Sequence, residues 1–368
     1  MKTLRRVCAF VLALAALLSL TGCVNHNWSV KSGDEQIAAG VYIYYMMTAY
    51  NDATARLEEL NEEKDDKDKI DVSKVDILTS TIDGKTGRQW ILDETRNYCK
   101  RHFAVEKLCA DRNIKLKDED ISSINNTLNY MVSYYGTFFQ EAGISVDSVR
   151  EVYENSYLYS DLLYSYYDNK GEYAVKEEDI KKYFSENYFA YKALEAPYSY
   201  TSNGKETKYK DDEIKARKEL IEEYFNEATK LDKADIETYN KKYANRDLKE
   251  GEKEKEPAKL TLQFATEDAT TKYGDEFFEE LKKAKVGDFL KFEVKDKGIY
   301  LIQKCDEYTA DESKKYKETR ETCIGAMVED DYKKLLNEKT ATMDFVYNEK
   351  ALEKYSLDKL IGILNSNS

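Results

Sequence analysis

The sequence is short of histidine and of proline. Of its 368 residues, 2 are His and 2 are Pro, whereas 31 are Tyr. With so little His, few side chains can exchange protons near neutral pH, so chemistry or metal binding that needs several imidazoles is nearly excluded. With so little Pro, helices can run without interruption. These shortages predict long helices and disfavour a histidine-based enzyme.

Positive charge is also in short supply. The chain has 57 Lys and Arg against 71 Asp and Glu, which gives a formal net charge of −14. Binding to nucleic acid needs clustered Lys and Arg that contact phosphates, so no nucleic-acid partner is expected. The mean hydropathy is −0.72, which excludes a protein that crosses a membrane many times. The length suits two or three domains.

The N-terminus has the pattern of an export signal. Residues 1–6 carry three basic side chains, and 7–20 form an apolar run that is too short to cross a bilayer. The tetrapeptide at 20–23 (LTGC) resembles the bacterial lipobox, in which a diacylglyceryl group is attached to the cysteine and the chain is cut before it. We therefore predict a lipoprotein signal peptide at 1–22, then a lipidated Cys23 and a polar tether up to residue 33. An ordinary secretory signal with an incidental cysteine is the alternative.

Four further cysteines lie in the body of the chain. Cys99 and Cys109 fall on one predicted helix, and ten residues at ~1.5 Å each place them about 15 Å apart, too far for a disulfide. A bridge between Cys305 and Cys323 stays open, with buried thiols as the alternative. The sequence has no CxxC motif and no Cys/His cluster, so no metal is expected.

The region 34–191 has the spacing of long amphipathic helices. Apolar residues recur every three or four positions, and acidic residues at 118–120 suit the positive end of a helix dipole. We predict helices over 36–60, 89–111, 118–141, 145–169 and 177–191.

After Pro197 the pattern changes to a small α+β module, which we place at 192–308. Alternating apolar residues predict strands near 192–201, 260–264, 289–294 and 299–304, with helices over 211–231, 234–243 and 273–283. The region 309–368 returns to helix, mainly over 311–336. It is expected to complete the N-terminal helical region by packing on it rather than on the module.

The order of these parts resembles the PrsA/SurA-type extracytoplasmic foldases. The strongest local resemblance lies within 112–191, at 113–121 (NIKLKDEDI), 135–136 (YG), 141–145 (EAGIS) and 175–184 (VKEEDIKKYF). The resemblance implies an α+β, predominantly helical fold. In that fold a SurA-like chaperone lobe is interrupted by a small domain, and a C-terminal helix returns to the lobe.

The module itself resembles a parvulin-like (PpiC-type) peptidyl-prolyl isomerase domain. The similar residues are Phe277, Leu281, 286–288 (VGD) and 298–302 (GIYLI). By this resemblance the pocket positions are Phe277, Gly298, Tyr300 and Ile302. Tyr300 stands where the family has a His, 258–264 lacks the family's Gly residues, and 192–200 lacks its other His. These departures leave enzyme activity open and predict a weak or inactive isomerase.

Aromatic and Met residues form two dense clusters, near 42–50 and near 130–139. Rigid aromatic rings and adaptable Met side chains suit weak binding of many partners. The candidate client-binding residues are Tyr42, Tyr44, Tyr45, Met47, Tyr130, Tyr134 and Tyr135. Packing within the core is the alternative for both clusters. His102 lies in the middle of a predicted helix and is expected at its surface or boundary.

These observations predict a lipid-anchored chaperone on the outer face of the bacterial cytoplasmic membrane. Its partners would be unfolded or newly exported polypeptides, and it would need no cofactor, metal or nucleotide. One alternative is an active prolyl isomerase with an altered pocket. Another is a surface lipoprotein that binds one fixed protein partner.

Overall fold

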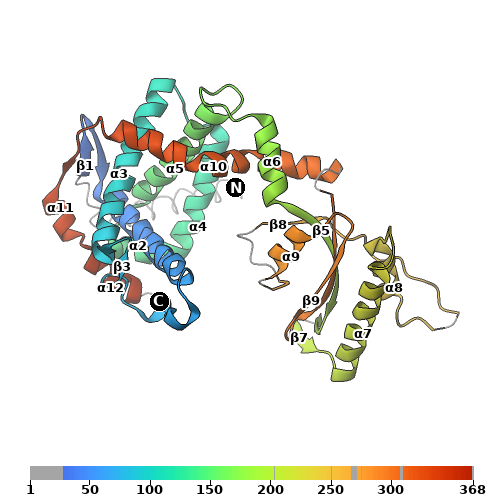
Figure 1. The fold of residues 1–368 in the computed structure, drawn as a ribbon. Coiled ribbons are helices and arrows are strands. Elements are labelled where there is room, and N and C mark those ends of the chain that lie inside the picture. Colours follow the sequence, from blue (N-terminus) through green and yellow to red (C-terminus); the bar gives the residue numbers. More distant parts are fainter. Residues whose placement is uncertain are drawn as a thin grey trace, which may run out of the picture. The chain divides into compact units, whose positions relative to one another are not determined.

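The computed structural model describes residues 28–366, apart from 203, 250, 267–271, 275 and 307–309. The predicted signal peptide and Cys23 lie outside these residues. Contacts divide the chain into two units: unit 1 runs up to Glu172 and resumes at Val328, and unit 2 is Tyr173–Met327 (Figure 1). The predicted α+β class with mainly helical content is confirmed. Among the described residues, no helix combines the length and the apolar character needed to cross a membrane.

Unit 1 is built on long helices that match the predicted ones. They are α2 (Ala39–Glu62), α3 (Gly87–Arg112), α4 (Asp118–Ala142) and α5 (Val146–Tyr167). Helix α2 lies in the middle of the core, where it packs against α3 and α5. Its close approach to α5 depends on Gly40, because a Cβ there would lie 2.4 Å from the Ser148 hydroxyl.

The ends of these helices follow from local sequence. The Ser145 hydroxyl accepts the Ser148 N–H at 3.0 Å and so caps the start of α5. The Asp120 carboxylate accepts the Lys117 N–H at 2.9 Å and stabilises the start of α4. Gly143 ends α4 with a φ of +80°, a left-handed conformation that glycine adopts without steric cost.

A small antiparallel sheet joins the two ends of unit 1. Its strand order is β11 (Val346–Tyr347), β1 (Trp28–Ser32) and β2 (Glu35–Ala38). The prediction of a polar tether up to residue 33 is therefore wrong for β1, where Ser29 and Val30 are fully buried. Ser29 is satisfied because its hydroxyl donates to the carbonyls of Ile37 and Ala38.

Shorter elements complete unit 1. They are the 3₁₀ turns η1 (Asp66–Asp68) and η2 (Val72–Lys74), the hairpin β3 (Thr81–Ile82) and β4 (Lys85–Thr86), and the helices α11 (Glu349–Lys354) and α12 (Leu357–Ser366). Leu357 and Leu360 of α12 are buried in the same core as α2, which places the C-terminal segment inside the helical unit.

Unit 2 contains a four-stranded antiparallel sheet covered on both faces. The strand order is β8 (Gln263–Ala265), β5 (Phe189–Pro197), β10 (Gly298–Lys304) and β9 (Phe289–Val294). Helices α7 (Asp211–Ala228) and α8 (Ile236–Ala244) cover one face, and α9 (Phe277–Lys283) covers the other (Figure 1). Successive β10 residues alternate between these faces: Leu301 packs with α7 and α8, whereas Tyr300 and Ile302 pack with α9.

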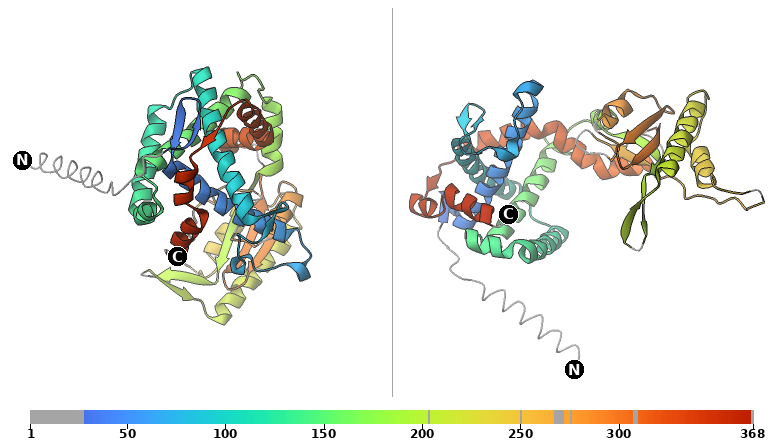
Figure 2. Two further views of the ribbon diagram at one scale, coloured as in Figure 1. Left: turned by 90° about the vertical axis from the view of Figure 1, so that its left-hand side faces the viewer. Right: turned by 90° about the horizontal axis from the view of Figure 1, so that it is seen from below.

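Two further elements of unit 2 precede or leave the sheet. Helix α6 (Glu177–Asn187) leads directly into β5, and its Ile180 and Phe184 are buried. A hairpin of β6 (Ser199–Ser202) and β7 (Lys205–Lys208), which the sequence pattern did not predict, extends away from the sheet (Figure 2).

Helix α10 (Ala310–Thr340) takes part in both units. Within unit 2 its Tyr316 and Arg320 contact Glu177 of α6, at 2.7 and 2.9 Å. Within unit 1 the hydroxyl of the fully buried Tyr332 donates to the Tyr159 carbonyl of α5 at 2.9 Å. The expected packing on the N-terminal helices is thus correct for the second part of α10. The first part contacts α6, which lies within the predicted N-terminal region 34–191 but belongs to unit 2 by its contacts.

Candidate functional site

The parvulin-like pocket positions converge on the α9 face of the sheet in unit 2. Phe277 and Ile302 are fully buried there, and Tyr300 is 5% exposed. Gly298 starts β10 and lies close to the same ring, because an added Cβ would come within 3.1 Å of the Tyr300 hydroxyl. The four positions named from the sequence are therefore neighbours in the structure.

Aromatic rings fill the space around Tyr300. Its ring meets Tyr273 edge-on, with 5.0 Å between the ring centroids. Phe277 lies 4.6 Å from Tyr273, 5.0 Å from Tyr191 and 5.2 Å from Phe292, measured between centroids. These are the distances of packed aromatic pairs. We call these five residues the ring cluster, and its geometry is that of a packed core.

The polar atoms of the ring cluster are poorly suited to acid–base chemistry. Burial, and then the Glu195 carboxylate, raise the pKa of Tyr300 above its ordinary value. The hydroxyl of Tyr191 donates to Gln263 Oε1 at 3.1 Å. Burial, and secondarily Tyr191, raise the pKa of Tyr273. At neutral pH these phenols stay protonated, so the cluster offers no base for proton transfer.

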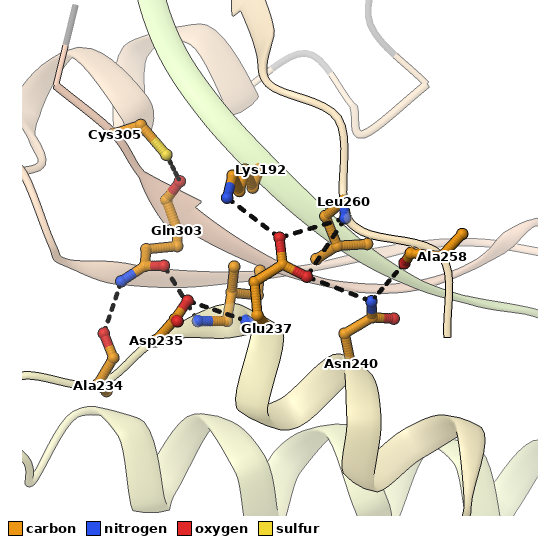
Figure 3. A network of polar contacts seen from close by, with 10 residues as sticks. Lys192, Ala234, Asp235, Glu237, Asn240, Ala258, Leu260, Gln303 and Cys305 are labelled. Carbon is orange, nitrogen blue, oxygen red and sulfur yellow. Dashed lines mark hydrogen bonds and ion pairs between the residues drawn. The ribbon is translucent and has the colours of Figure 1, made fainter. Parts of the chain in front are cut away.

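A polar network on the opposite face of the sheet holds α8 to β5 (Figure 3). The Glu237 carboxylate accepts from Lys192 Nζ at 3.1 Å and from the Leu260 N–H at 3.2 Å. Asn240 donates to the Ala258 carbonyl at 2.9 Å. Burial alone would raise the pKa of Glu237, but the bonds from Lys192 and Leu260 outweigh it and hold that pKa below its usual value. The network fastens the 258–260 segment to α8, which is a structural role.

The second aromatic cluster lies on α4 and reaches the surface of unit 1. Tyr134 is 70% exposed, Tyr130 is 55% exposed and Tyr135 is 48% exposed. The rings of Tyr130 and Tyr134 lie side by side, with centroids 4.4 Å apart. We call these three residues the α4 tyrosine surface. They are the predicted client-binding candidates that solvent can reach directly.

The first aromatic cluster lies on α2 and belongs to the core. Tyr42 and Tyr45 are 4% and 7% exposed, and Tyr44 and Met47 are half-buried against the same core. These four residues are predicted client-binding candidates, with packing in the core as the alternative. The alternative holds for this cluster, because α2 has α3 and α5 beside it and the β1–β2 hairpin before it. The four residues stabilise unit 1 and do not form a surface.

His102 is also a core residue, contrary to the expected boundary position. It is 1% exposed, and its Nδ1 is hydrogen-bonded to the Tyr45 hydroxyl at 2.9 Å. Its Nε2 lies 3.2 Å from Glu106 and 3.8 Å from Glu151. Burial raises the pKa of Glu151 to about 7 against the lowering effect of His102, and Glu106 adds to the rise. The sequence does contain a signal for this position, because His102 follows Thr95 and Cys99 on the buried stripe of α3.

The four described cysteines are thiols. Cys99 and Cys109 lie on α3 as predicted, and burial raises the pKa of Cys109 to about 11. Cys323 is buried and Cys305 half-buried, and no disulfide joins them. The open question from the sequence is thus resolved in favour of thiols.

Fold and surface together define a class: an α+β protein whose helical unit is interrupted by a sheet unit and exposes aromatic side chains. No family model matches the chain, and no curated protein matches it. The chain is similar to solved structures of the foldase protein PrsA from several bacteria.

These structures come from different bacteria. The one from Streptococcus pneumoniae is 15% identical, with 71% of this chain and 92% of that chain covered and a TM-score of 0.35. The one from Bacillus subtilis is 15% identical, with 77% and 93% covered and a TM-score of 0.29. The one from Lactococcus lactis is 12% identical, with 88% and 96% covered and a TM-score of 0.32. These likenesses assign no role to any residue of this chain.

Proposed function

We propose that this chain is a lipid-anchored chaperone that holds exported polypeptides on the outer face of the bacterial cytoplasmic membrane. It needs no nucleotide, and its sheet unit serves as a structural element rather than as an isomerase. The lipobox-like segment at 20–23 motivates the anchor and the location. The α4 tyrosine surface is the single observation that carries the holding function.

Exposing aromatic rings to water costs free energy, which a partner that covers them would recover. Soluble proteins usually bury tyrosine rings and leave only the hydroxyl in water. On α4, three tyrosines within six positions are about half exposed or more. A surface of this kind offers apolar contact area at low entropic cost, which suits weak contacts with many unfolded segments.

The ring cluster supports a structural role for the sheet unit. Isomerisation must lower a rotational barrier of ~20 kcal/mol, which requires polar groups placed around the bound amide. Here Tyr300 packs edge-on against Tyr273 and stays protonated at neutral pH. Apolar packing of this kind stabilises the sheet but supplies no such groups.

Light scattering of a chemically denatured, aggregating protein tests the holding function. The full-length protein should suppress aggregation without nucleotide at a molar excess of a few-fold. The double variant Tyr130→Ser/Tyr134→Ser should suppress it less, while its circular dichroism spectrum stays unchanged. If the folded wild-type protein has no effect on unrelated substrates, the proposal fails and a single fixed partner becomes the better explanation.

A further inference from the structure

The charge along α4 and α5 is mostly negative, although Lys117 borders the first turn of α4, where its ammonium group pairs with Asp161 of α5 at 3.2 Å. Helix α4 carries Asp118, Glu119 and Asp120 in its first turn and Glu141 near its end, with no Lys or Arg in between. Over the longer span 118–167, which includes α5, there are eight acidic residues and one basic residue, Arg150. An aromatic surface in such surroundings attracts cations and repels anions.

Exposed tyrosine rings add a short-range preference for cations. The negative face of an aromatic ring attracts a guanidinium or ammonium group within about 6 Å of its centroid. This chain already uses the contact elsewhere in unit 1, since Arg112 lies 3.6 Å from the ring centroid of Tyr166. On α4, by contrast, the rings of Tyr130 and Tyr134 are directed to solvent and are open to a cation from another molecule.

Helix α4 also contains a glycine in its interior. Gly136 lies in the middle of α4, where glycine costs about 1 kcal/mol relative to alanine. The nearest atom to a Cβ added there would be Val132 Cγ1 of the same helix, at 3.8 Å. No close neighbour therefore requires this glycine, which is half-buried and lies on a different side of α4 from Tyr130 and Tyr134.

We propose that the α4 tyrosine surface and the acidic first turn of α4 together bind cationic, extended polypeptide segments. The inference rests on the proposed holding function and assigns it a substrate class. At 3.6 residues per turn, Glu119 and Asp120 share a side of α4 with Tyr134, whereas Asp118 lies on the opposite side. From Glu119 to Tyr134 the helix rises about 22 Å at ~1.5 Å per residue, a distance that about seven extended residues span. Lys or Arg side chains in such a segment would contact the rings at one end and the carboxylates at the other.

The test uses labelled peptides of defined charge. Three twelve-residue peptides alternate Ser with Arg, with Gln or with Glu, and fluorescence anisotropy follows their titration with full-length protein in phosphatidylcholine nanodiscs. The Arg peptide should bind at least about tenfold more tightly than the Gln peptide, given two ring contacts and several carboxylates. The Glu peptide should not bind, and added salt should weaken the binding of the Arg peptide.

Two variants locate the binding. The double variant Tyr130→Ser/Tyr134→Ser should bind the Arg peptide about tenfold more weakly than the wild type, since two exposed cation–ring contacts are lost. Tyr200→Ser, on the β6–β7 hairpin, is the matched control because Tyr200 is 45% exposed and lies in unit 2. It should leave the affinity unchanged. Circular dichroism shows whether each variant is folded.

The outcomes separate this inference from the holding function. Equal binding of the Arg and Glu peptides, or an unchanged affinity in the double variant, overturns the cationic preference. If the wild-type protein still suppresses aggregation in that case, holding stands and only the substrate class is wrong. If the protein suppresses no aggregation but binds the Arg peptide through the two tyrosines, the surface recognises cationic segments for another purpose, and the holding function is rejected.

Discussion

Replacing Glu151 with Gln should change how the stability of unit 1 depends on pH. The Glu151 carboxylate lies 3.8 Å from the buried His102, and burial raises its pKa from the ordinary 4.5 to about 7. Because its pKa is raised, the folded state binds this proton more tightly than the unfolded chain does. The resulting stabilisation is complete below pH 4.5 and is lost as the pH rises through 7.

The size of the effect follows from the two pKa values. The rise of the Glu151 pKa from 4.5 to about 7 corresponds to at most about 3.4 kcal/mol, at 1.36 kcal/mol for each pH unit. The Glu151 side chain is 34% exposed, so solvent screens the interaction and about 1–2 kcal/mol is a better expectation. Gln imitates the protonated carboxyl at every pH. The variant Glu151→Gln should therefore equal the wild type near pH 4.5 and be more stable by that amount at pH 8.

Tryptophan fluorescence during urea unfolding is a suitable assay. Both tryptophans of the chain, Trp28 and Trp90, lie in unit 1, so the signal reports on the unit that contains Glu151. Glu154→Gln is the control on the same helix, with a 39% exposed side chain, and should shift stability by no more than about 0.5 kcal/mol at either pH. A Glu151→Gln variant that is less stable than wild type at pH 8 would refute the reasoning.

Three further predictions concern other parts of the chain. Cys23→Ala should abolish fatty-acid labelling and move the protein from the detergent phase to the aqueous phase; continued labelling would reject the lipobox. The purified protein should not accelerate prolyl isomerisation in a short peptide, and Tyr300→Phe should leave the rate at background; a wild-type rate that falls in this variant would restore the isomerase alternative. Gly136→Ala should raise the free energy of unfolding of unit 1 by about 0.5–1 kcal/mol, measured by thermal melting, because the added methyl has space; a lower melting temperature would show that the glycine is needed for packing.

Local signals in the sequence were sufficient for most helices and for the β9–β10 hairpin. Helix α4 was predicted over 118–141 and spans Asp118–Ala142, because acidic residues begin it and Gly143 ends it. Strands β9 and β10 follow the predicted alternation, and Gly298 begins the second strand. Each of these signals lies within a few residues of the feature that it predicts.

Features that depend on distant parts of the chain could not be predicted in this way. The local sequence of β1 has the composition of a polar tether. It forms a strand because it pairs with β2 and with β11. Tyr42 and Tyr45 are buried because α2 has neighbours on several sides, which no periodicity within α2 can report. The prediction that His102 lies at the surface or boundary is wrong for the same reason, since its burial depends on contacts from Tyr45 of α2.

The pairing of β1 with β11 has a consequence for the order in which the protein folds. Asn348 donates to the carbonyl of Trp28, a residue 320 positions earlier. Because the chain emerges with its N-terminus first, β1 is exposed before nearly all of the chain that separates it from this partner. All strands of the four-stranded sheet lie between Phe189 and Lys304, so that sheet can form first. Until β11 arrives, one edge of β1 stays unpaired and open to other chains. A chain interrupted before Val346 should therefore be prone to aggregate while its sheet unit is already folded.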